Sequence, residues 1–185
     1  MTHISSFKIR QAVQKIHAGE TIAYPTEAVY GLGCDPLNEE AVHNLLALKQ
    51  RSAEKGLILI ASSLSQLEPY LQLNEDIVSR VQATWPGAVT WIIPAQSWVP
   101  SWLKGKHSSL AVRVTAHPVA KVLCQKYGEA LVSTSANTHS KPPATRPYMV
   151  SKSLDYSDIF ILPGQIGHLK QATPIYDVLS HQQIR

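Results

Sequence analysis

Cysteine is scarce in this 185-residue chain, and the sequence also lacks the features of a disulfide-linked, metal-binding or membrane-spanning protein. Cys34 and Cys124 stand alone without CxxC spacing, which excludes a disulfide scaffold and a zinc knuckle. The eight histidines are scattered, so we expect no metal held tightly by the protein. No apolar run approaches the ~20 residues of a membrane span, and residues 1–20 lack the apolar centre of a signal peptide. We therefore expect a cytoplasmic protein that makes no contact with a membrane.

The common motifs of enzyme chemistry are also absent. There is no GxxxxGK[ST] phosphate loop, no GxSxG nucleophile turn and no HExxH zinc motif, and GLGCDP is an incomplete GxGxxG. Glu27 and Asp35 stand eight residues apart across a loop, and nothing marks them as an acid/base pair. What remains is a chain with clustered cations and hydroxyls but no evident nucleophile. That inventory suits a reaction driven by positioning and charge stabilisation, such as phosphoryl or nucleotidyl transfer.

Charged residues make up only 16% of the chain, and their signs are unevenly distributed. Residues 1–103 include seven basic and nine acidic residues, a balance of −2. Residues 104–185 include ten basic and four acidic residues, a balance of +6. A basic C-terminal part fits a polyanionic partner such as RNA. It also describes a solvated basic surface, and charge alone favours this second interpretation.

Hydrophobic periodicity predicts helices and strands that alternate along one domain, residues 1–185. Helices are expected at 6–17, from 39 onward with Asn38 as the cap, at 64–71, at 75–85 with Asn74 as the cap, and at 117–127. Strands are expected at 21–26, 56–62, 88–94, 109–115, 130–135 and 159–164. Residues 30–36 are expected to form a turn-rich loop, and 138–150, with three prolines, a flexible loop beside a site. The mixture predicts an α/β fold with helices packed on a mixed sheet.

The stretch LKQRSAEKG, residues 48–56, places three cations at the end of a predicted helix: Lys49, Arg51 and Lys55. Lys49 falls on the same helical stripe as the apolar Val42, so it must either extend outward or reach a buried anion. The simpler interpretation is that these cations interact favourably with the negative end of the helix dipole, which stabilises the helix by up to ~1 kcal/mol. Three cations followed at once by a buried strand favour a phosphate or carboxylate site.

Two further segments carry polar groups on predicted strands. Alternation in SLAVRVT puts Arg113 mid-strand among small neighbours, where its guanidinium could fork around an oxyanion. An exposed sheet face with Arg113 paired to a surface carboxylate explains this segment equally well. STSAN, residues 133–137, ends a strand with three hydroxyls and an amide, which could line a ligand crevice or close a hydrogen-bonded turn.

Five blocks of the sequence resemble one known family. The order and spacing of the YrdC-like family are reproduced by AYPTEAVYGLGCDP, LKQRSAEKGLILIA, WPGAVTWIIP, SLAVRVTAHP and LVSTSAN. The paired pattern Lys49-x-Arg51 and Ser135-x-Asn137 is the most diagnostic feature, and the resemblance spans about residues 12–185. It implies an open, twisted mixed β-sheet flanked by helices around a positively charged concave cavity.

The resemblance also implies a nucleotidyltransferase. Its substrates would be L-threonine, bicarbonate or CO2, and ATP with Mg2+, and its products threonylcarbamoyl-adenylate and diphosphate. The adenylate would feed a threonylcarbamoyl-transferase complex that installs the t6A modification on adenosine 37 of tRNAs reading codons that begin with A. The chain would meet tRNA directly or through that complex, and we expect it to be a monomer.

Family position assigns roles to individual residues. The residues expected to bind ATP and stabilise the departing diphosphate are Lys49, Arg51, Lys55, Ser109, Ser135, Asn137 and Arg185, with Lys49 and Arg51 catalytic. The residues expected to bind threonine are Thr26, Arg113, Ser133 and Thr173.

Two other functions fit the sequence. A non-catalytic protein that binds tRNA or double-stranded RNA, and assists RNA or ribosome maturation, would use the basic C-terminal part. Its binding would weaken steeply with salt and ignore threonine. A related carbamoyl-adenylate module, of the kind found in hydrogenase maturation proteins, is disfavoured because those modules sit in much longer chains.

Overall fold

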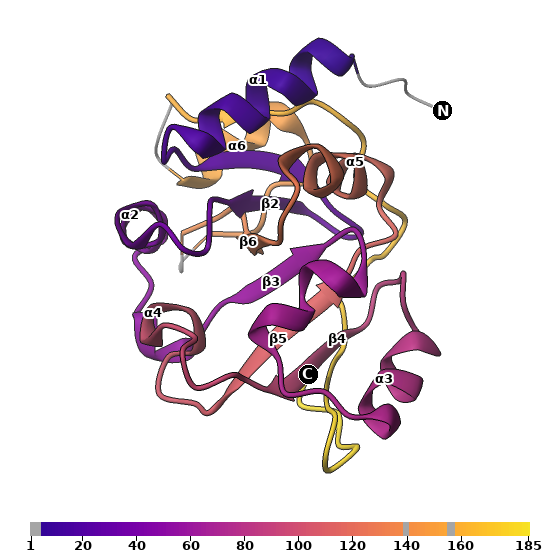
Figure 1. The fold of residues 1–185 in the computed structure, drawn as a ribbon. Helices are drawn as coiled ribbons and strands as arrows, with labels where there is room; N and C mark the ends of the chain where they lie inside the picture. The colour runs from indigo at the N-terminus through magenta and orange to yellow at the C-terminus, as the bar shows by residue number, and fades with distance from the viewer. Residues whose placement is uncertain (1–4, 139–140, 155–157) are drawn as a thin grey trace.

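One eight-stranded mixed sheet forms the centre of the molecule, and helices cover it (Figure 1). The computed structural model describes residues 5–138, 141–154 and 158–185. The strands are β1 (Ile22–Pro25), β2 (Tyr30–Gly33), β3 (Ile58–Ala61), β4 (Thr90–Pro94), β5 (Ser109–Val114), β6 (Leu131–Ser135), β7 (Phe160–Ile161) and β8 (Ile175–Asp177). Their order in the sheet is β7-β1-β2-β6-β3-β5-β4-β8. The prediction of an α/β fold with a mixed sheet is confirmed.

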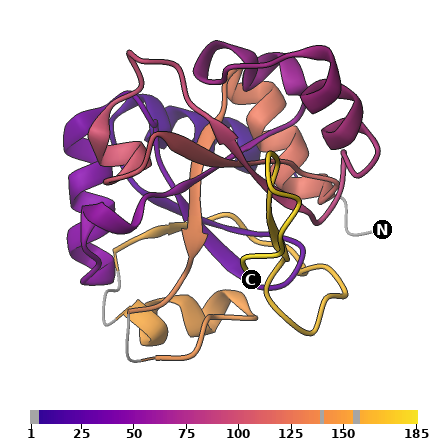
Figure 2. The same ribbon diagram turned by 90° about the horizontal axis from the view of Figure 1, so that it is seen from below.

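The helices pack on the sheet through two groups of buried apolar side chains. The α-helices are α1 (Ser6–His17), α2 (Glu39–Lys49), α3 (Glu75–Gln82), α4 (Ser101–Lys104), α5 (Pro118–Tyr127) and α6 (Pro147–Leu154), with 3-10 turns η1 (Ala53–Lys55), η2 (Leu64–Gln66) and η3 (Glu68–Tyr70). One group joins α1 and α5, which lie side by side, to β1, β3 and β6. The larger group takes side chains from α2, α3, α4 and α6. Figure 2 shows the ribbon of these helices around the sheet, seen from below. Because both groups hold the central strands, polar side chains on those strands are carried by a rigid support.

Helix caps follow the predicted chemistry. Asn38 accepts a hydrogen bond from the Ala41 amide, and Asn74 accepts one from the Ile77 amide. Each bond satisfies an amide that the first turn of a helix leaves without a partner. The predicted starts of α2 and α3 are therefore confirmed.

The predicted loop at 30–36 is wrong, because most of it is strand β2. Leu32 pairs with Ala23 of β1 on one side and with Thr134 of β6 on the other. Gly33 is required by packing, since a Cβ there would lie 2.5 Å from the Val132 carbonyl oxygen. Glycines that looked like turn residues are in fact sites of close approach between neighbouring strands.

Other boundaries also differ from the sequence prediction. Residues 64–71 form two 3-10 turns instead of one helix, because Pro69 has no amide hydrogen to donate. Helix α6 occupies the end of the stretch 138–150 that was expected to be a flexible loop; residues 139 and 140 of that stretch lie outside the described residues. Strand β8 and helix α4 were not predicted. Over the described ranges, no helix has both the length and the apolar character needed to cross a membrane.

Candidate functional site

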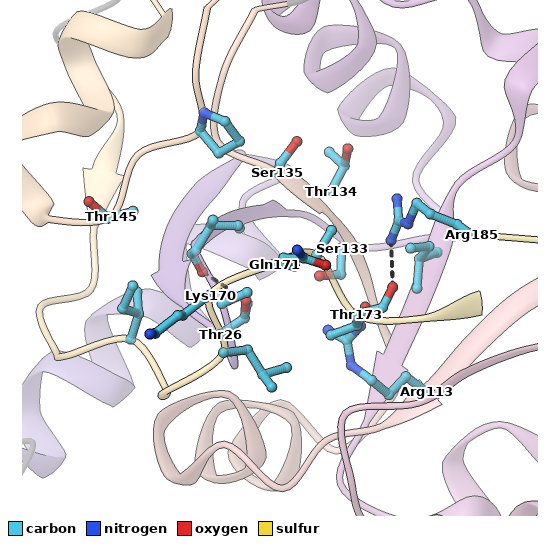
Figure 3. Close-up of a pocket in the computed structure, with 18 of the residues that line it drawn as sticks. Thr26, Arg113, Ser133, Thr134, Ser135, Thr145, Lys170, Gln171, Thr173 and Arg185 are labelled. Atoms are coloured by element: carbon cyan, nitrogen blue, oxygen red, sulfur yellow. Dashed lines mark hydrogen bonds between the residues drawn. The ribbon is translucent and has the colours of Figure 1, made fainter.

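A cavity of about 610 Å3 opens where the central strands meet several irregular segments (Figure 3). Strands β2, β3, β5 and β6 contribute Gly31, Ile58, Arg113 and Ser133–Ser135. The irregular segments contribute, among others, Thr26, Arg51, Thr145, Lys170, Gln171, Thr173 and Arg185. None of the described residues lining this cavity is an aspartate or a glutamate. Cations and hydroxyls therefore meet at one place without a lining carboxylate, which favours an anionic ligand.

Arg113 is fixed on the cavity wall by three neighbours. Its side chain is buried, and its Nη1 donates to the hydroxyls of Thr90 at 3.1 Å and Thr173 at 3.0 Å. Its Nη2 lies 3.2 Å from Oε2 of Glu27, which is also buried. Its Nε is buried and has no hydrogen-bond partner among the described residues. Mid-strand burial of Arg113 on the face predicted from alternation is confirmed, and the alternative of an exposed sheet face is wrong.

Arg51 and Arg185 complete a set of three guanidinium groups along the cavity. Arg51 donates from Nη2 to the Gly56 carbonyl oxygen at 2.9 Å, and its Nε is buried with no partner in the described chain. Arg185 donates from Nη2 to the Thr173 carbonyl oxygen at 3.1 Å (Figure 3). Burial, and then the charge of Arg185, lower the pKa of Arg51. Burial, and then the charge of Arg113, lower the pKa of Arg185. The charge of Arg185 thus interacts unfavourably with those of Arg51 and Arg113, and binding of an anion would offset this repulsion.

Lys49 lies beneath the site instead of lining it. The side chain is only 5% exposed, and its Nζ donates to the carbonyl oxygens of Ser135 and, at 2.8 Å, of Asn137. The Lys49 side chain therefore neither extends outward nor meets an anionic side chain, because backbone carbonyl oxygens at the end of β6 accept its hydrogen bonds. Burial, and then the charge of Arg51, lower the pKa of Lys49 to about 8. Direct contact between Lys49 and phosphate stays a prediction.

This buried lysine makes the stability of the fold depend on pH. In the unfolded chain Lys49 keeps its proton up to its ordinary pKa of 10.5, whereas in the fold it loses the proton near pH 8. The unfolded state therefore binds more protons between these values, and stability contributed at this site rises with pH. Relative to Lys49→Met, the free energy of unfolding of the wild type should rise by up to ~3 kcal/mol between pH 7 and pH 10.5. Urea unfolding at a series of pH values measures the free energy of unfolding, with the exposed Lys106→Met as the control. If that free energy depends on pH in the same way in the wild type and in Lys49→Met, the lowered pKa of Lys49 is contradicted.

The remaining predicted site residues divide by position. Thr26, Ser133, Ser135 and Thr173 line the cavity together with the three arginines. Three others are not among the lining residues: Lys55, Ser109 and Asn137. Lys55 is exposed on turn η1, and Ser109 begins β5. Asn137 donates from Nδ2 to the carbonyl oxygens of Thr138 at 2.9 Å and Lys141 at 2.6 Å, which closes the turn after β6.

Sequence reasoning assigned no site role to several polar residues at or beside the cavity, among them Thr145. Lys170 and Gln171 line the cavity from a segment without regular secondary structure, where no periodicity points to them. Glu27 was considered only as a partner of Asp35, whereas it pairs with Arg113. A signal for it did exist, because an arginine predicted in the middle of a buried strand needs a carboxylate nearby.

Comparison with known proteins identifies the family of the chain. Residues 14–185 match the family model described as Telomere recombination, which covers Sua5, YciO and YrdC proteins. A protein of Methylococcus capsulatus named Threonylcarbamoyl-AMP synthase is 49% identical over 186 residues, which is 100% of each chain. A protein of Nitrosococcus oceani with the same name is 48% identical over 97% of this chain and 98% of its own.

A solved structure gives the same result. The crystal structure of P. abyssi Sua5 complexed with L-threonine matches with a TM-score of 0.86 and 31% identity. The match covers 95% of this chain and 52% of that one, so this chain spans about half the length of that protein. Because the family model matches residues 14–185 and relatives of nearly 50% identity cover almost the whole chain, the chain belongs to the Sua5/YciO/YrdC family.

Proposed function

We propose that this chain is a threonylcarbamoyl-AMP synthase, which converts L-threonine, bicarbonate or CO2, and ATP into threonylcarbamoyl-adenylate and diphosphate. The observation that carries the proposal is the set of three arginines on a cavity without a lining carboxylate. Relatives of that name match the chain over its whole length, and a relative of known structure binds L-threonine. The carbamate made from threonine and the ATP it attacks are both anions, so their mutual repulsion must be offset by fixed cations.

The reaction needs positioning more than a reactive side chain. The threonine amine and CO2 form a carbamate, and a carbamate oxygen then bonds to the α-phosphorus of ATP. The bond from that phosphorus to the β-phosphate oxygen breaks, and diphosphate leaves with the electron pair. No enzyme group is covalently modified, which agrees with a cavity whose lining offers cations and hydroxyls. Fixed guanidinium groups would stabilise the charge that grows on the departing diphosphate.

The geometry supports a division of the cavity into two ends. At the threonine end, Arg113 would receive the amino-acid carboxylate beside the hydroxyls of Thr26, Ser133 and Thr173. At the nucleotide end, Arg51, Ser135 and Arg185 would contact ATP. Arg185 lies close enough to both other arginines to serve the α-phosphate between the two ends.

The residues outside the lining would contribute less directly. Lys49 and Asn137 would shape the end of β6, where Ser135 lies, and the turn that follows it. Lys55 and Ser109 would reach ATP only if their segments moved toward it. Contact of Lys55 and Ser109 with ATP therefore stays a prediction.

Magnesium would enter with ATP. Mg2+ prefers carboxylate, phosphate and water oxygens, and the described lining provides no carboxylate. Across the described residues, no group of three or more histidine, cysteine or acidic side chains is placed to hold a metal. The residues present therefore do not fit a protein-ligated Mg2+, and the ion would be held by the phosphates as part of the substrate.

We also infer where the chain works. Its product would pass to a threonylcarbamoyl-transferase complex that modifies tRNA, and the balance of +6 over residues 104–185 supports contact with tRNA or with that complex. We propose that the chain acts as a monomer in the cytoplasm.

Diphosphate release tests the proposed function. The wild type is incubated with ATP and Mg2+, and L-threonine and bicarbonate are each added or omitted. We expect release only when both are present. Release under no combination, together with salt-sensitive binding of RNA, would replace the synthase by a non-catalytic RNA-binding protein.

A further inference from the structure

Glu27 is a buried carboxylate beside the cavity that the proposed reaction does not use. It lies in the turn between β1 and β2, which is closed by bonds from the amide and hydroxyl of Thr26 to the Val29 carbonyl oxygen. Thr26, Ala28 and Val29 of this turn all line the cavity, whereas Glu27 does not. Its side chain points into the protein and is 7% exposed. Burying a carboxylate costs several kcal/mol unless partners compensate for the lost water, so its position needs an explanation.

The two carboxylate oxygens of Glu27 have different partners, in β5 and just after it. The Thr115 hydroxyl donates to Oε1 at 2.5 Å, and Nη2 of Arg113 lies 3.2 Å from Oε2. Thr115 also accepts the His117 amide at 3.1 Å, so the hydroxyl that orients Glu27 is itself held at the end of the strand. Glu27 is thereby fixed on one side by a neutral donor and on the other by a charge.

Arg113 keeps free donors on the side that these contacts leave open. Its Nη1 donates to the hydroxyls of Thr90 and Thr173. Its Nη2 forms an ion pair with Oε2 of Glu27, an oxygen that accepts no hydrogen bond from the described residues. The buried Nε has no partner among the described residues, no hydrogen bond from Nη2 is formed to them, and the side chain lines the cavity. A guanidinium binds a carboxylate best through two adjacent N–H groups, and its plane must then be fixed.

The backbone of Glu27 holds the opposite wall of the cavity. The Leu169 amide donates to the Glu27 carbonyl oxygen at 3.3 Å, and the Gly167 amide donates to the Thr26 carbonyl oxygen at 2.9 Å. A Cβ at Gly167 would lie 2.5 Å from the Glu27 carbonyl oxygen. These contacts are independent of the Glu27 side chain, so a substitution that alters only its charge leaves the wall in place.

We propose that Glu27 is a positioning residue for the amino-acid substrate, because its ion pair with Arg113 holds that guanidinium in the orientation in which it lines the cavity and can receive the substrate carboxylate. The inference rests on the proposed function and adds a residue to the threonine end of the same cavity. Glu27 also offsets the repulsion between Arg113 and Arg185. It acts through Arg113 and does not touch the substrate.

Glu27→Gln is the sharpest test, because the amide keeps the size of the side chain and an oxygen for the Thr115 hydroxyl. We expect the KM for L-threonine in diphosphate release to rise about tenfold to a hundredfold, while the KM for ATP changes less than about threefold. Glu27→Asp should show a smaller rise, because it retains the charge at a shorter reach. Glu40→Gln, on the exposed start of α2, is the matched control and should match the wild type.

An uncharged analogue separates positioning from mere structural support. L-threonine amide has no carboxylate for Arg113, so the wild type should use it far less well than L-threonine. In Glu27→Gln that preference should fall about tenfold, because only the acid loses a contact. A thermal unfolding scan shows that each variant is folded.

Three outcomes would overturn the inference. A lower KM for L-threonine in Glu27→Gln would mean that Glu27 only weakens Arg113 by neutralising it. An equal rise in the KM for ATP and for L-threonine, with the preference over the amide unchanged, would make Glu27 a purely structural residue. A wild type that releases no diphosphate would overturn the proposed function itself, and this inference with it.

Discussion

Arg51→Ala should lower diphosphate release with all substrates present by about two to three orders of magnitude. Arg51 lines the cavity with a buried Nε that has no partner among the described residues, while Nη2 is tied to the Gly56 carbonyl oxygen. The guanidinium is thus held in place with donors to spare, which is the arrangement that stabilises a charge developing in the transition state. Arg51→Lys should lose most of the rate as well, because an ammonium presents no fork.

The loss should appear in activity and not in folding. The charge of Arg51 lowers the pKa of Lys49, so its removal relieves a repulsion in the folded state. We expect the free energy of unfolding to change by about 1 kcal/mol or less. Arg10→Ala, which removes an exposed arginine from α1, is the control and should retain full activity. Full activity in Arg51→Ala would show that the cavity does not bind the phosphates through this residue.

The parts of the fold that could be predicted from the sequence depend on local chemistry. The predicted bounds of α1, Ser6–His17, agree with the structure, because apolar spacing and a terminal glycine mark a helix within its own residues. The caps of α2 and α3 were predictable for the same reason, since the Asn38 and Asn74 side chains bond to amides three residues ahead. The arrangement of these elements into a mixed sheet followed from their order along the chain.

The parts that could not be predicted depend on distant neighbours. Strand β2 carries two glycines and looks like a loop until β1 and β6 pair with it on both sides. The orientation of Lys49 depends on carbonyl groups of Ser135 and Asn137, which are 86 and 88 residues away in sequence. Backbone carbonyls carry no residue-type signal, so helical periodicity could place Lys49 on the buried face without showing what it meets there.

The same reasoning applies to the counter-charge of Arg113. Alternation along β5 places Arg113 and Thr115 on one face, but it does not say which carboxylate meets them. Glu27 meets them because of how the strands are ordered. Strand β5 pairs with β3 at Arg113 and Ile60, β3 pairs with β6, and β6 pairs with β2, so the turn between β1 and β2 reaches this face. The candidate site was therefore predictable as a set of residue types, and its internal pairing was not.

Arg113→Met should destabilise the fold by ~3–5 kcal/mol, measured as the free energy of unfolding in urea. The reason is that Glu27 would remain buried with only the Thr115 hydroxyl to compensate for its charge. The double variant Glu27→Leu/Arg113→Met removes both charges and fills their space with apolar atoms. Replacing a buried ion pair in this way is often neutral or stabilising, so stability should return to within about 1–2 kcal/mol of the wild type.

Activity with L-threonine should not return with stability. The double variant keeps Thr26, Ser133 and Thr173 on the cavity wall but lacks the guanidinium that we assign to the substrate carboxylate. Its diphosphate release should therefore stay at the level of Arg113→Met. Recovery of stability without activity would mean that the Glu27–Arg113 pair is retained for substrate binding and not for folding. If the double variant were as unstable as Arg113→Met, the destabilisation would instead come from the hydroxyls of Thr90 and Thr173, which lose their donor in both variants.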